Sequence, residues 1–437
     1  MSPIPERPRS RRRISLRYAL LAAPLLAVGL AACSGGGNPL AAKPRTAAAE
    51  VSYGEAAGGK ADPAEPLEVA VKDGSQITDV TATDASGRYV VGDLSADGKS
   101  WRSTTPLAAG AHYTIRVSTE DSDGHPGRKT VRFDTTGAKS GFHVTFGPDA
   151  GTYGVGQPVT ASLSAPVKGK AARAIVESHL QVSSTPQAAK GSWYWVDSRT
   201  LHYRPSTYWP TQATIEARST LSGVRIGKNL YGAADKPLTL HTGARVEAIT
   251  DASTDHMTYK VDGKVVRTFP VTTGKPGFDT RNGIKVVLAK EQFVQMRSET
   301  VGIGGSDAYD LPVYWATRVT WSGEYVHAAP WSEGSQGYAN VSHGCTGMST
   351  ANAEWFFDHT RLGDLVQVIN SKGSTMTPFD NGFGDWNLSW AQWQQGSALT
   401  GGGGSGDTTT QPDTGQDHST PVDVPAGDPA RLTPQAA

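Results

Sequence analysis

Apolar and polar residues alternate with a period of two over much of this chain, which is the pattern of half-buried β-strands. Turn-forming clusters at 84–87 and 121–124 separate such runs at intervals of roughly ten residues. The apolar members of the alternating runs in this region are Tyr113, Ile115, Val117, Val131 and Phe133. Short strands at this spacing are typical of a β-sandwich.

The alternating sequence divides into two stretches, 62–138 and 139–243, and we predict an immunoglobulin-like sandwich for each. Neither stretch contains a cysteine pair, so no disulfide is expected to hold the sheets together. The second stretch is rich in large aromatic residues, namely Trp193, Tyr194, Trp195, Tyr203 and Tyr208. We assign these side chains to the sandwich core rather than to a carbohydrate-binding platform.

A third domain is predicted over 244–371, again built mainly of strands. Asp262-Gly263 lies between the runs 257–261 and 264–271, and this dipeptide favours a type I′ hairpin. The remaining predicted elements are strands at 284–288, 316–321 and 365–369 and one helix over 351–360, with Ser349 or Thr350 as its N-cap.

The composition changes again toward the C-terminus. Within 372–398, Trp386, Trp390 and Trp393 recur at the spacing of one helix face, and we expect this helix to dock on the third domain. The segment 399–437 consists mainly of Gly, Ser, Thr, Asp, Pro and Gln and is predicted to be disordered. The pattern therefore predicts an all-β, multidomain protein, with two immunoglobulin-like β-sandwich modules followed by a third β-sandwich domain.

The N-terminus has the pattern of an export signal. Five arginines between Arg9 and Arg17 precede the uncharged run 18–32, which is shorter than the ~20 residues of a transmembrane helix. The run ends in Leu-Ala-Ala-Cys33, which resembles a bacterial lipobox. We predict a signal peptide over 1–32, a lipid on Cys33 and a tether over 33–61. An ordinary signal peptide is the alternative, and Sec and twin-arginine export are both left open.

The mature protein is thus expected on the outer face of the cell membrane, anchored by its lipid and facing the cell wall. Its charge argues against a nucleic-acid partner, because 41 basic and 41 acidic residues give a formal net charge of zero. The chain has two cysteines, Cys33 and Cys345, and each has a separate predicted role, so a disulfide between them is not expected.

Cys345 is the candidate nucleophile. A thiol attacks an acyl carbon as the thiolate, and a nearby imidazole can accept its proton. His343 is two residues away, and a paired strand could bring His327 close. Gly344 lets the backbone turn and leaves consecutive N–H groups free to face an oxyanion, and the predicted helix would direct its positive end toward the thiol. Zinc bound by the two histidines and the cysteine is the other chemical possibility, but neither HExxH nor CxxC accompanies them, so no metal is expected.

The spacing of fourteen residues between His327 and the Ser-His-Gly-Cys motif at 342–345 resembles the signature of the YkuD-type L,D-transpeptidases. The likeness extends over 280–396, and over 62–243 it is one of architecture. The further stretches that look like mycobacterial-type members are Thr-Arg-Asn-Gly at 280–283, Gly-Glu-Tyr-Val-His at 323–327, Trp-Ser-Glu-Gly at 331–334, Ala-Glu-Trp-Phe at 353–356 and Gly-Asp-Trp-Asn at 384–387.

The resemblance implies a role for each residue of the motif. Cys345 would be the acyl-accepting nucleophile and His327 its general base, oriented by the carbonyl of Ala328. The residues implied to shape the pocket, its oxyanion hole, its lid and its wall are Ser342, His343, Gly344, Tyr309 and Trp331. Gly347 departs from the family, whose members usually have Asn or Arg there, and the departure raises the question of donor geometry or turnover.

The implied reaction is acyl transfer between peptidoglycan stem peptides, forming 3-3 crosslinks. A tetrapeptide donor would acylate Cys345 with loss of D-Ala, and the side-chain amine of a diamino acid on a second stem would resolve the thioester. No cofactor is expected, and carbapenem-type inhibitors would bind the same site. An L,D-carboxypeptidase, in which water resolves the thioester, and a non-catalytic cell-wall-binding lipoprotein are the alternatives.

Overall fold

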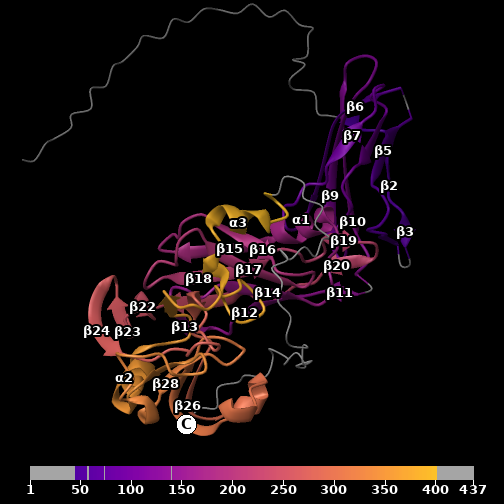
Figure 1. Ribbon diagram of the computed structural model, residues 1–437. Helices are drawn as coiled ribbons and strands as arrows, with labels where there is room; N and C mark the ends of the chain where they lie inside the picture. Colours follow the sequence, from indigo (N-terminus) through magenta and orange to yellow (C-terminus); the bar gives the residue numbers. More distant parts are fainter. Residues whose placement is uncertain (1–44, 57–58, 73, 139, 401–437) are drawn as a thin grey trace, which may run out of the picture. The chain divides into compact units, whose positions relative to one another are not determined.

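The computed structural model describes residues 45–56, 59–72, 74–138 and 140–400 (Figure 1). The predicted signal peptide, Cys33 and the tail from residue 401 lie outside the described residues. The described part is mostly β-structure with three α-helices, which confirms the predicted all-β class. Within it, no helix is long and apolar enough to cross a membrane.

The first module is a sandwich of two sheets, ordered β1-β10-β9-β6 and β2-β5-β8-β7, with a separate β3-β4 hairpin. On β9, every second side chain from Tyr113 to Thr119 is buried, as the alternation predicted. The strands of this module are β1 Arg45–Thr46, β2 Ala49–Ser52, β3 Glu55–Ala56, β4 Lys60–Ala61, β5 Glu68–Val71, β6 Gln76–Asp84, β7 Gly92–Leu94, β8 Ser100–Ser103, β9 His112–Glu120 and β10 Pro126–Asp134.

This module begins earlier than predicted. The predicted tether covers 33–61, but strands β1 to β4 lie within 45–61. Ala47, Ala49 and Ala61 are buried in the module core, and β2 pairs antiparallel with β5. The pattern missed these strands because alanine buries little apolar area and so gives a weak hydrophobic signal.

The second module has two four-stranded sheets, β12-β14-β17-β16 and β13-β21-β18-β15, and a small sheet β11-β20-β19. Trp193 and Trp195 are buried, and Tyr203 and Tyr208 pack against the same core, so the predicted core role is confirmed for these four. Tyr194 instead packs against Phe379 and Trp393 of the C-terminal segment. The strands are β11 Gly141–Phe142, β12 Val144–Gly147, β13 Gly151–Tyr153, β14 Val159–Leu163, β15 Leu180–Thr185, β16 Gly191–Trp195, β17 Thr200–Pro205, β18 Thr214–Ser219, β19 Arg225–Gly227, β20 Leu230–Gly232 and β21 Leu238–Thr242.

The second module also contains a helix that the sequence analysis did not predict, α1 (Lys170–Ser178). It follows Gly169, whose positive φ of 81° ends the extended backbone before the helix. The buried side chains of α1 are those of Val176 and Glu177, and Trp195 Nε1 donates a hydrogen bond of 3.0 Å to Glu177. The nine residues are amphipathic at the helical period, but the segment is short and lies among predicted strands, and the sequence analysis did not single it out.

The third domain packs a five-stranded sheet, β24-β23-β22-β30-β25, and a four-stranded sheet, β26-β27-β28-β29, around a common core. Asp262 and Gly263 both have positive φ, as a type I′ hairpin requires, and Ser349 Oγ accepts the N–H of Asn352 at the start of α2. The elements are β22 Val246–Asp251, β23 His256–Val261, β24 Lys264–Pro270, β25 Gly283–Val286, β26 Ala289–Arg297, η1 Ser298–Val301, η2 Gly305–Asp307, β27 Asp310–Arg318, β28 Tyr325–Ala328, η3 Pro330–Ser332, β29 Thr346–Met348, α2 Thr350–His359 and β30 Leu365–Ile369.

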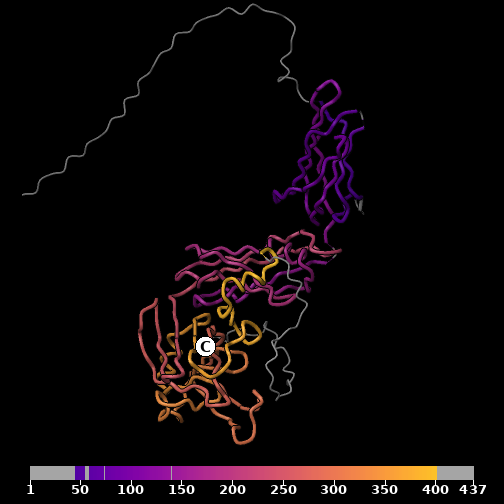
Figure 2. Tube along the Cα trace, turned by 45° about the horizontal axis from the view of Figure 1, so that its top comes forward, coloured from indigo at the N-terminus to yellow at the C-terminus, as the bar shows by residue number. Residues whose placement is uncertain are grey.

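The C-terminal segment, yellow in Figure 2, docks its helix on the second module and not on the third domain as predicted. Helix α3 (Trp390–Gln395) is preceded by a separate 3-10 turn, η4 (Asp385–Asn387), so the three tryptophans do not share one continuous helix. Trp393 Nε1 donates to Ser192 O on β16 at 2.9 Å, and Trp386 Nε1 donates to Gly156 O at 2.7 Å.

Arg204 of β17 explains this docking. Its side chain is buried, and its guanidinium lies 4.8, 5.6 and 4.5 Å from the ring centroids of Trp386, Trp390 and Trp393. A buried cation needs such partners, since stacking on aromatic faces offsets part of its lost hydration. The spacing of the tryptophans in the sequence indicated an aromatic surface. It did not indicate that this surface covers Arg204 of the second module.

The second module and the third domain approach each other at backbone level. Gly154 N donates to Leu362 O at 2.8 Å, and a side chain at Gly154 would lie 2.2 Å from the backbone nitrogen of Asp364. Val286 and Leu365 of the third domain belong to the hydrophobic core of the second module. The glycine is therefore needed for a junction in which two domains share apolar contacts.

Candidate active site

Strand pairing brings the two parts of the sequence motif together. Strands β28 and β29 are parallel neighbours, with His327 opposite Gly347, and Cys345 immediately precedes β29. Histidine and cysteine are eighteen residues apart in the chain, but the pairing sets His327 on the strand next to the one that follows Cys345. Strand β29 also separates Cys345 from α2, which begins at Thr350, so the thiol lies outside the first helical turn where the helix dipole acts most strongly.

The Cys345 thiol is largely enclosed and protonated at neutral pH. Burial raises its pKa to about 12, although a hydrogen bond from the backbone of Tyr325 lowers it. The Sγ–H group donates to the carbonyl of Gly323 at 3.4 Å. This thiol therefore rests in the neutral form and needs a base at the moment it reacts.

His327 has the protonation state that such a base requires. The imidazole is buried, burial lowers its pKa, and Nδ1 lies 2.7 Å from the carbonyl oxygen of Ala328. A carbonyl accepts hydrogen bonds only, so Nδ1 carries the proton and Nε2 retains its lone pair. The ring of Trp331 lies 6.1 Å from that of His327, and the Trp331 side chain is about half exposed.

The turn before the thiol is fixed by its own side chains. Ser342 Oγ donates to Cys345 O at 2.6 Å and accepts the N–H of Gly344 at 3.1 Å. Gly344 has a φ of 118°, and its carbonyl accepts a 2.8 Å bond from Thr280 Oγ1. The Gly344 N–H is thus engaged by Ser342 and is not free to face an oxyanion, contrary to the prediction.

His343 packs against two aromatic rings. Its ring centroid is 4.8 Å from that of Phe278 and 5.1 Å from that of Tyr309. Its Nε2 atom is 3.5 Å from Asp307, which also forms an ion pair with Lys275. Burial raises the pKa of Tyr309, and a negative charge on Cys345 raises it further, so Tyr309 lies within electrostatic reach of the thiol.

Gly347, the departure from the family pattern, occupies a crowded position. An added Cβ would lie 3.0 Å from Ala329 Cβ and 3.1 Å from Thr272 Cγ2. The Gly347 N–H also donates to Thr272 O at 2.9 Å. A larger residue would need these neighbours to shift by a few tenths of an ångström, which accounts for glycine here.

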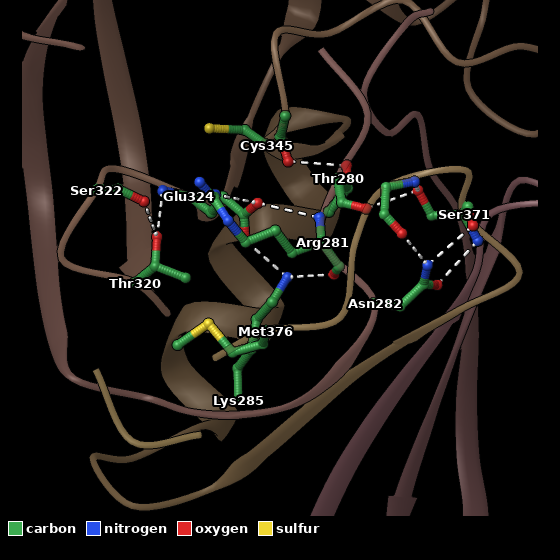
Figure 3. A network of polar contacts seen from close by, with 12 residues as sticks. Thr280, Arg281, Asn282, Lys285, Thr320, Ser322, Glu324, Cys345, Ser371 and Met376 are labelled. Atoms are coloured by element: carbon green, nitrogen blue, oxygen red, sulfur yellow. Dashed lines mark hydrogen bonds and ion pairs between the residues drawn. The ribbon is translucent and has the colours of Figure 1, made fainter. Parts of the chain in front are cut away.

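Three charged residues near the thiol were missed by the sequence analysis. Glu324 pairs with Lys285 Nζ at 2.7 Å and with Arg281 Nη1 at 3.0 Å, and both Glu324 and Lys285 are buried (Figure 3). The signal was present in the sequence, because a lysine interrupts the apolar strand run 284–288. Within the described part of the chain, Asp121, Asp123 and His125 bring their ligand atoms close enough together to hold a metal ion. The described residues around Cys345 form no cluster of this kind.

The chain is similar to known bacterial proteins over most of its length. A family model for a bacterial Ig domain matches residues 59–225, and one for an L,D-transpeptidase catalytic domain matches 245–368. L,D-transpeptidase 2 of Mycobacterium tuberculosis (strain CDC 1551 / Oshkosh) is 33% identical over 335 residues, which are 76% of this chain and 81% of that protein.

L,D-transpeptidase 5 of Mycobacterium tuberculosis (strain ATCC 25618 / H37Rv) is 31% identical over 408 residues, covering 90% of this chain and 87% of its own length. A solved structure of the L,D-transpeptidase LdtMt1 in complex with imipenem has 35% sequence identity and a TM-score of 0.45. It covers 52% of this chain and 99% of its own. The chain is thus similar to these enzymes both in its catalytic domain and across the preceding modules.

Proposed function

The chain belongs to the L,D-transpeptidase family, and we propose that it forms 3-3 crosslinks in peptidoglycan through a thioester on Cys345. The observation that carries this proposal is the parallel pairing of β28 with β29. It sets a neutral imidazole, oriented by the Ala328 carbonyl, on the strand beside the reactive thiol.

In the first step, His327 Nε2 removes the proton of Cys345 Sγ, and the sulfur attacks the carbonyl that joins an L-centre to a terminal D-alanine. The C–N bond breaks, D-alanine leaves with the proton held by His327, and a thioester remains. The amine of a diamino acid on a second stem attacks the thioester and gives its proton to His327. Sulfur leaves as the thiolate and is reprotonated, so no external energy source is needed.

The resting hydrogen bond of the thiol requires one rearrangement before the first step. Cys345 Sγ–H is directed to Gly323 O in the resting state, so a bound donor must redirect the proton toward His327. Tyr309, His343 and Trp331 supply aromatic surface around the sulfur and the imidazole. These contacts support roles for the three residues in holding the donor peptide and excluding water.

Intact-protein mass spectrometry tests the thioester directly. We expect the wild-type protein mixed with a stem tetrapeptide to gain the mass of the donor minus D-alanine, and Cys345→Ala to gain nothing. A crosslinked dimer would identify a transpeptidase, and free tripeptide in its place would identify an L,D-carboxypeptidase. A folded wild-type protein that yields no adduct, dimer or tripeptide would contradict the proposal.

We also propose that the protein is exported and anchored by a lipid on Cys33, a residue outside the described part of the chain. The support is the basic segment, the apolar run 18–32 and the lipobox-like Leu-Ala-Ala-Cys. The anchor would keep the catalytic domain between membrane and wall. Cys33→Ser should move the protein from the membrane fraction to the medium, and an unchanged distribution would refute the anchor.

Carbapenem-type inhibitors are a further proposed ligand class. Their strained carbonyl would acylate Cys345 as the donor peptide does, but with no D-alanine to release. The adduct should therefore equal the full inhibitor mass, should be absent from Cys345→Ala and should block the tetrapeptide reaction. An adduct that persists in Cys345→Ala would show that the inhibitor reacts elsewhere.

A further inference from the structure

A buried ion pair holds the backbone that touches the Cys345 sulfur. Lys285 on β25 is 1% exposed, and its Nζ lies 2.7 Å from Glu324 Oε2 and donates to Arg281 O at 2.8 Å. Glu324 Oε1 accepts the backbone N–H of Arg281 at 3.1 Å and its Nη1–H at 3.0 Å. The Glu324 carboxylate is therefore fixed by three donors from one short segment, 281–285.

Both residues that flank Glu324 form hydrogen bonds with the thiol. Gly323 O accepts the Sγ–H group, and the backbone of Tyr325 contributes a hydrogen bond to the sulfur. Glu324 N in turn donates to Thr320 Oγ1 at 2.8 Å. Anchoring Glu324 at both its carboxylate and its N–H thus fixes the two backbone groups that orient the thiol.

The residue just before this segment holds the turn that carries the thiol. Thr280 Oγ1 donates to the carbonyl of Gly344, the residue before Cys345. Thr280 and Arg281 are neighbours in the chain, so one loop holds both the turn that carries the sulfur and the segment before β28 whose Gly323 carbonyl accepts the Sγ–H hydrogen bond. Figure 3 shows this arrangement, with Cys345 above and Lys285 below the Glu324 and Arg281 contacts.

We propose that Lys285 and Glu324 are positioning residues for the nucleophile, and that their opposite charges balance each other beneath the sulfur. The inference rests on the proposed function, in which Cys345 is the acylated group. It extends that function by assigning the control of thiol geometry and ionisation to a pair outside the sequence motif. A buried pair of this kind is costly to desolvate, so a role in specificity is a better reason for it than stability.

The charges around the sulfur predict the direction in which each variant should shift the pKa of the thiol. The charged or titratable side chains that interact electrostatically with it are those of Lys285, Tyr309, Arg318, Glu324 and Tyr325. The strand next to β29 carries His327, opposite Gly347. After burial and the Tyr325 backbone bond, Glu324 raises the pKa of the thiol, and Lys285 and Arg318 lower it. Removing one member of the pair should therefore shift the thiol in one direction, and removing the other should shift it in the opposite direction.

The experiment measures the pH dependence of iodoacetamide alkylation at the Cys345 peptide, by mass spectrometry of the full-length mature protein. We expect Lys285→Met to raise the alkylation midpoint by about one pH unit, because the variant removes a cation that favours the thiolate while Arg281 keeps Glu324 ionised. Glu324→Gln should lower it by about one unit. At a fixed pH below the midpoints, these shifts correspond to about tenfold slower and about tenfold faster alkylation.

Two further variants separate positioning from loss of fold. The double variant Lys285→Met/Glu324→Gln removes both charges and should return the midpoint close to that of the wild type. Glu247→Gln neutralises a partly exposed ion pair with Arg245 in the same domain and should leave the midpoint unchanged. Melting temperatures of all variants identify any protein that is unfolded.

Shifts of the same sign in both single variants, or no shift in either, would overturn the inference. Alkylation needs no peptide donor, so this outcome is independent of the proposed function. Opposite shifts without any thioester from the tetrapeptide would support the pair and contradict the donor. A thioester in the wild type, together with unchanged alkylation midpoints in the variants, would support the donor and contradict the role of the pair. For acyl transfer, the single variants should change kcat more than KM, since the pair acts on the sulfur and not on the peptide.

Discussion

The first and second modules share a sandwich architecture, but they differ in what completes their hydrophobic cores. The core of the first module consists of residues between Ala47 and Phe133. The core of the second module includes Val286 and Leu365, which belong to the third domain. The second module is therefore a structural part of the catalytic unit, and the first module has a core of its own.

The C-terminal segment strengthens this difference. Trp386 and Trp393 donate hydrogen bonds to the second module, and Asn387 Oδ1 accepts the N–H of Ile284 in the third domain at 2.7 Å. Glu177 of α1 accepts the Ala398 N–H at 2.7 Å. One short segment thus ties the second module to the third domain by side-chain and backbone bonds.

Truncation should give the largest effect. A protein of residues 140–400 keeps the whole shared core, and we expect it to form the thioester at the full-length rate. A protein of residues 244–400 exposes Val286 and Leu365 and loses the support for Trp386 and Trp393. It should be unfolded or aggregated, with acylation reduced by at least about a hundredfold (~3 kcal/mol). Equal acylation by both truncated proteins would show that the shared core is dispensable.

Two buried tryptophans offer a matched comparison of the modules. Trp393 is fully buried where the C-terminal segment packs on the second module, and Trp101 is buried in the first module. Each change to alanine should cost about 3–5 kcal/mol of local stability. Only Trp393→Ala should lower the temperature at which acylation activity is lost. If Trp101→Ala lowers that temperature equally, the two cores are energetically coupled.

The junction should also weaken as the pH rises. Asp364 is fully buried beside Gly154, and burial raises its pKa to about 7. Because the folded-state pKa lies above the unfolded value, the protonated form stabilises the fold, fully so below about pH 4, and this contribution is lost as the pH rises through 7. We expect the unfolding free energy to fall by about 2–3 kcal/mol between pH 5 and pH 7.

Thermal unfolding from pH 4 to pH 8 measures this effect, with Asp364→Asn as the matched variant. The amide cannot ionise, so the slope over this range should be much flatter in Asp364→Asn. The first-module variant Trp101→Ala should keep the wild-type slope. An Asp364→Asn protein with an unchanged slope would assign the pH dependence to other groups.

The smallest effect is expected at an exposed ion pair of the first module. Arg102 and Glu68 pair across β8 and β5, with both side chains substantially exposed. Solvent and salt screen such a pair, so Arg102→Ala should change the unfolding free energy by less than about 1 kcal/mol. Chemical denaturation is the appropriate measurement, and acylation should be unaffected. A larger loss would indicate that the arginine stem packs on the module core.

Local sequence was sufficient for features that neighbouring residues decide. Asp262-Gly263 predicted the hairpin, Ser349 was one of two residues named as the cap of α2, and alternation predicted β9. Each depends on backbone dihedrals or on burial of one face, which short-range sequence encodes. The family signature around His327 and Cys345 likewise depends on a fixed spacing of residues.

Tertiary structure alone decided which surfaces meet. The position of α3 depends on Arg204, nearly two hundred residues before it in the chain, and Lys285 became interpretable only when Glu324 lay beside it. Ser342 takes the Gly344 N–H that the sequence left free. Hydrophobic periodicity indicates which side chains are buried. The partner of a buried charge or hydrogen-bond donor is set by long-range packing, which the pattern along the chain does not contain.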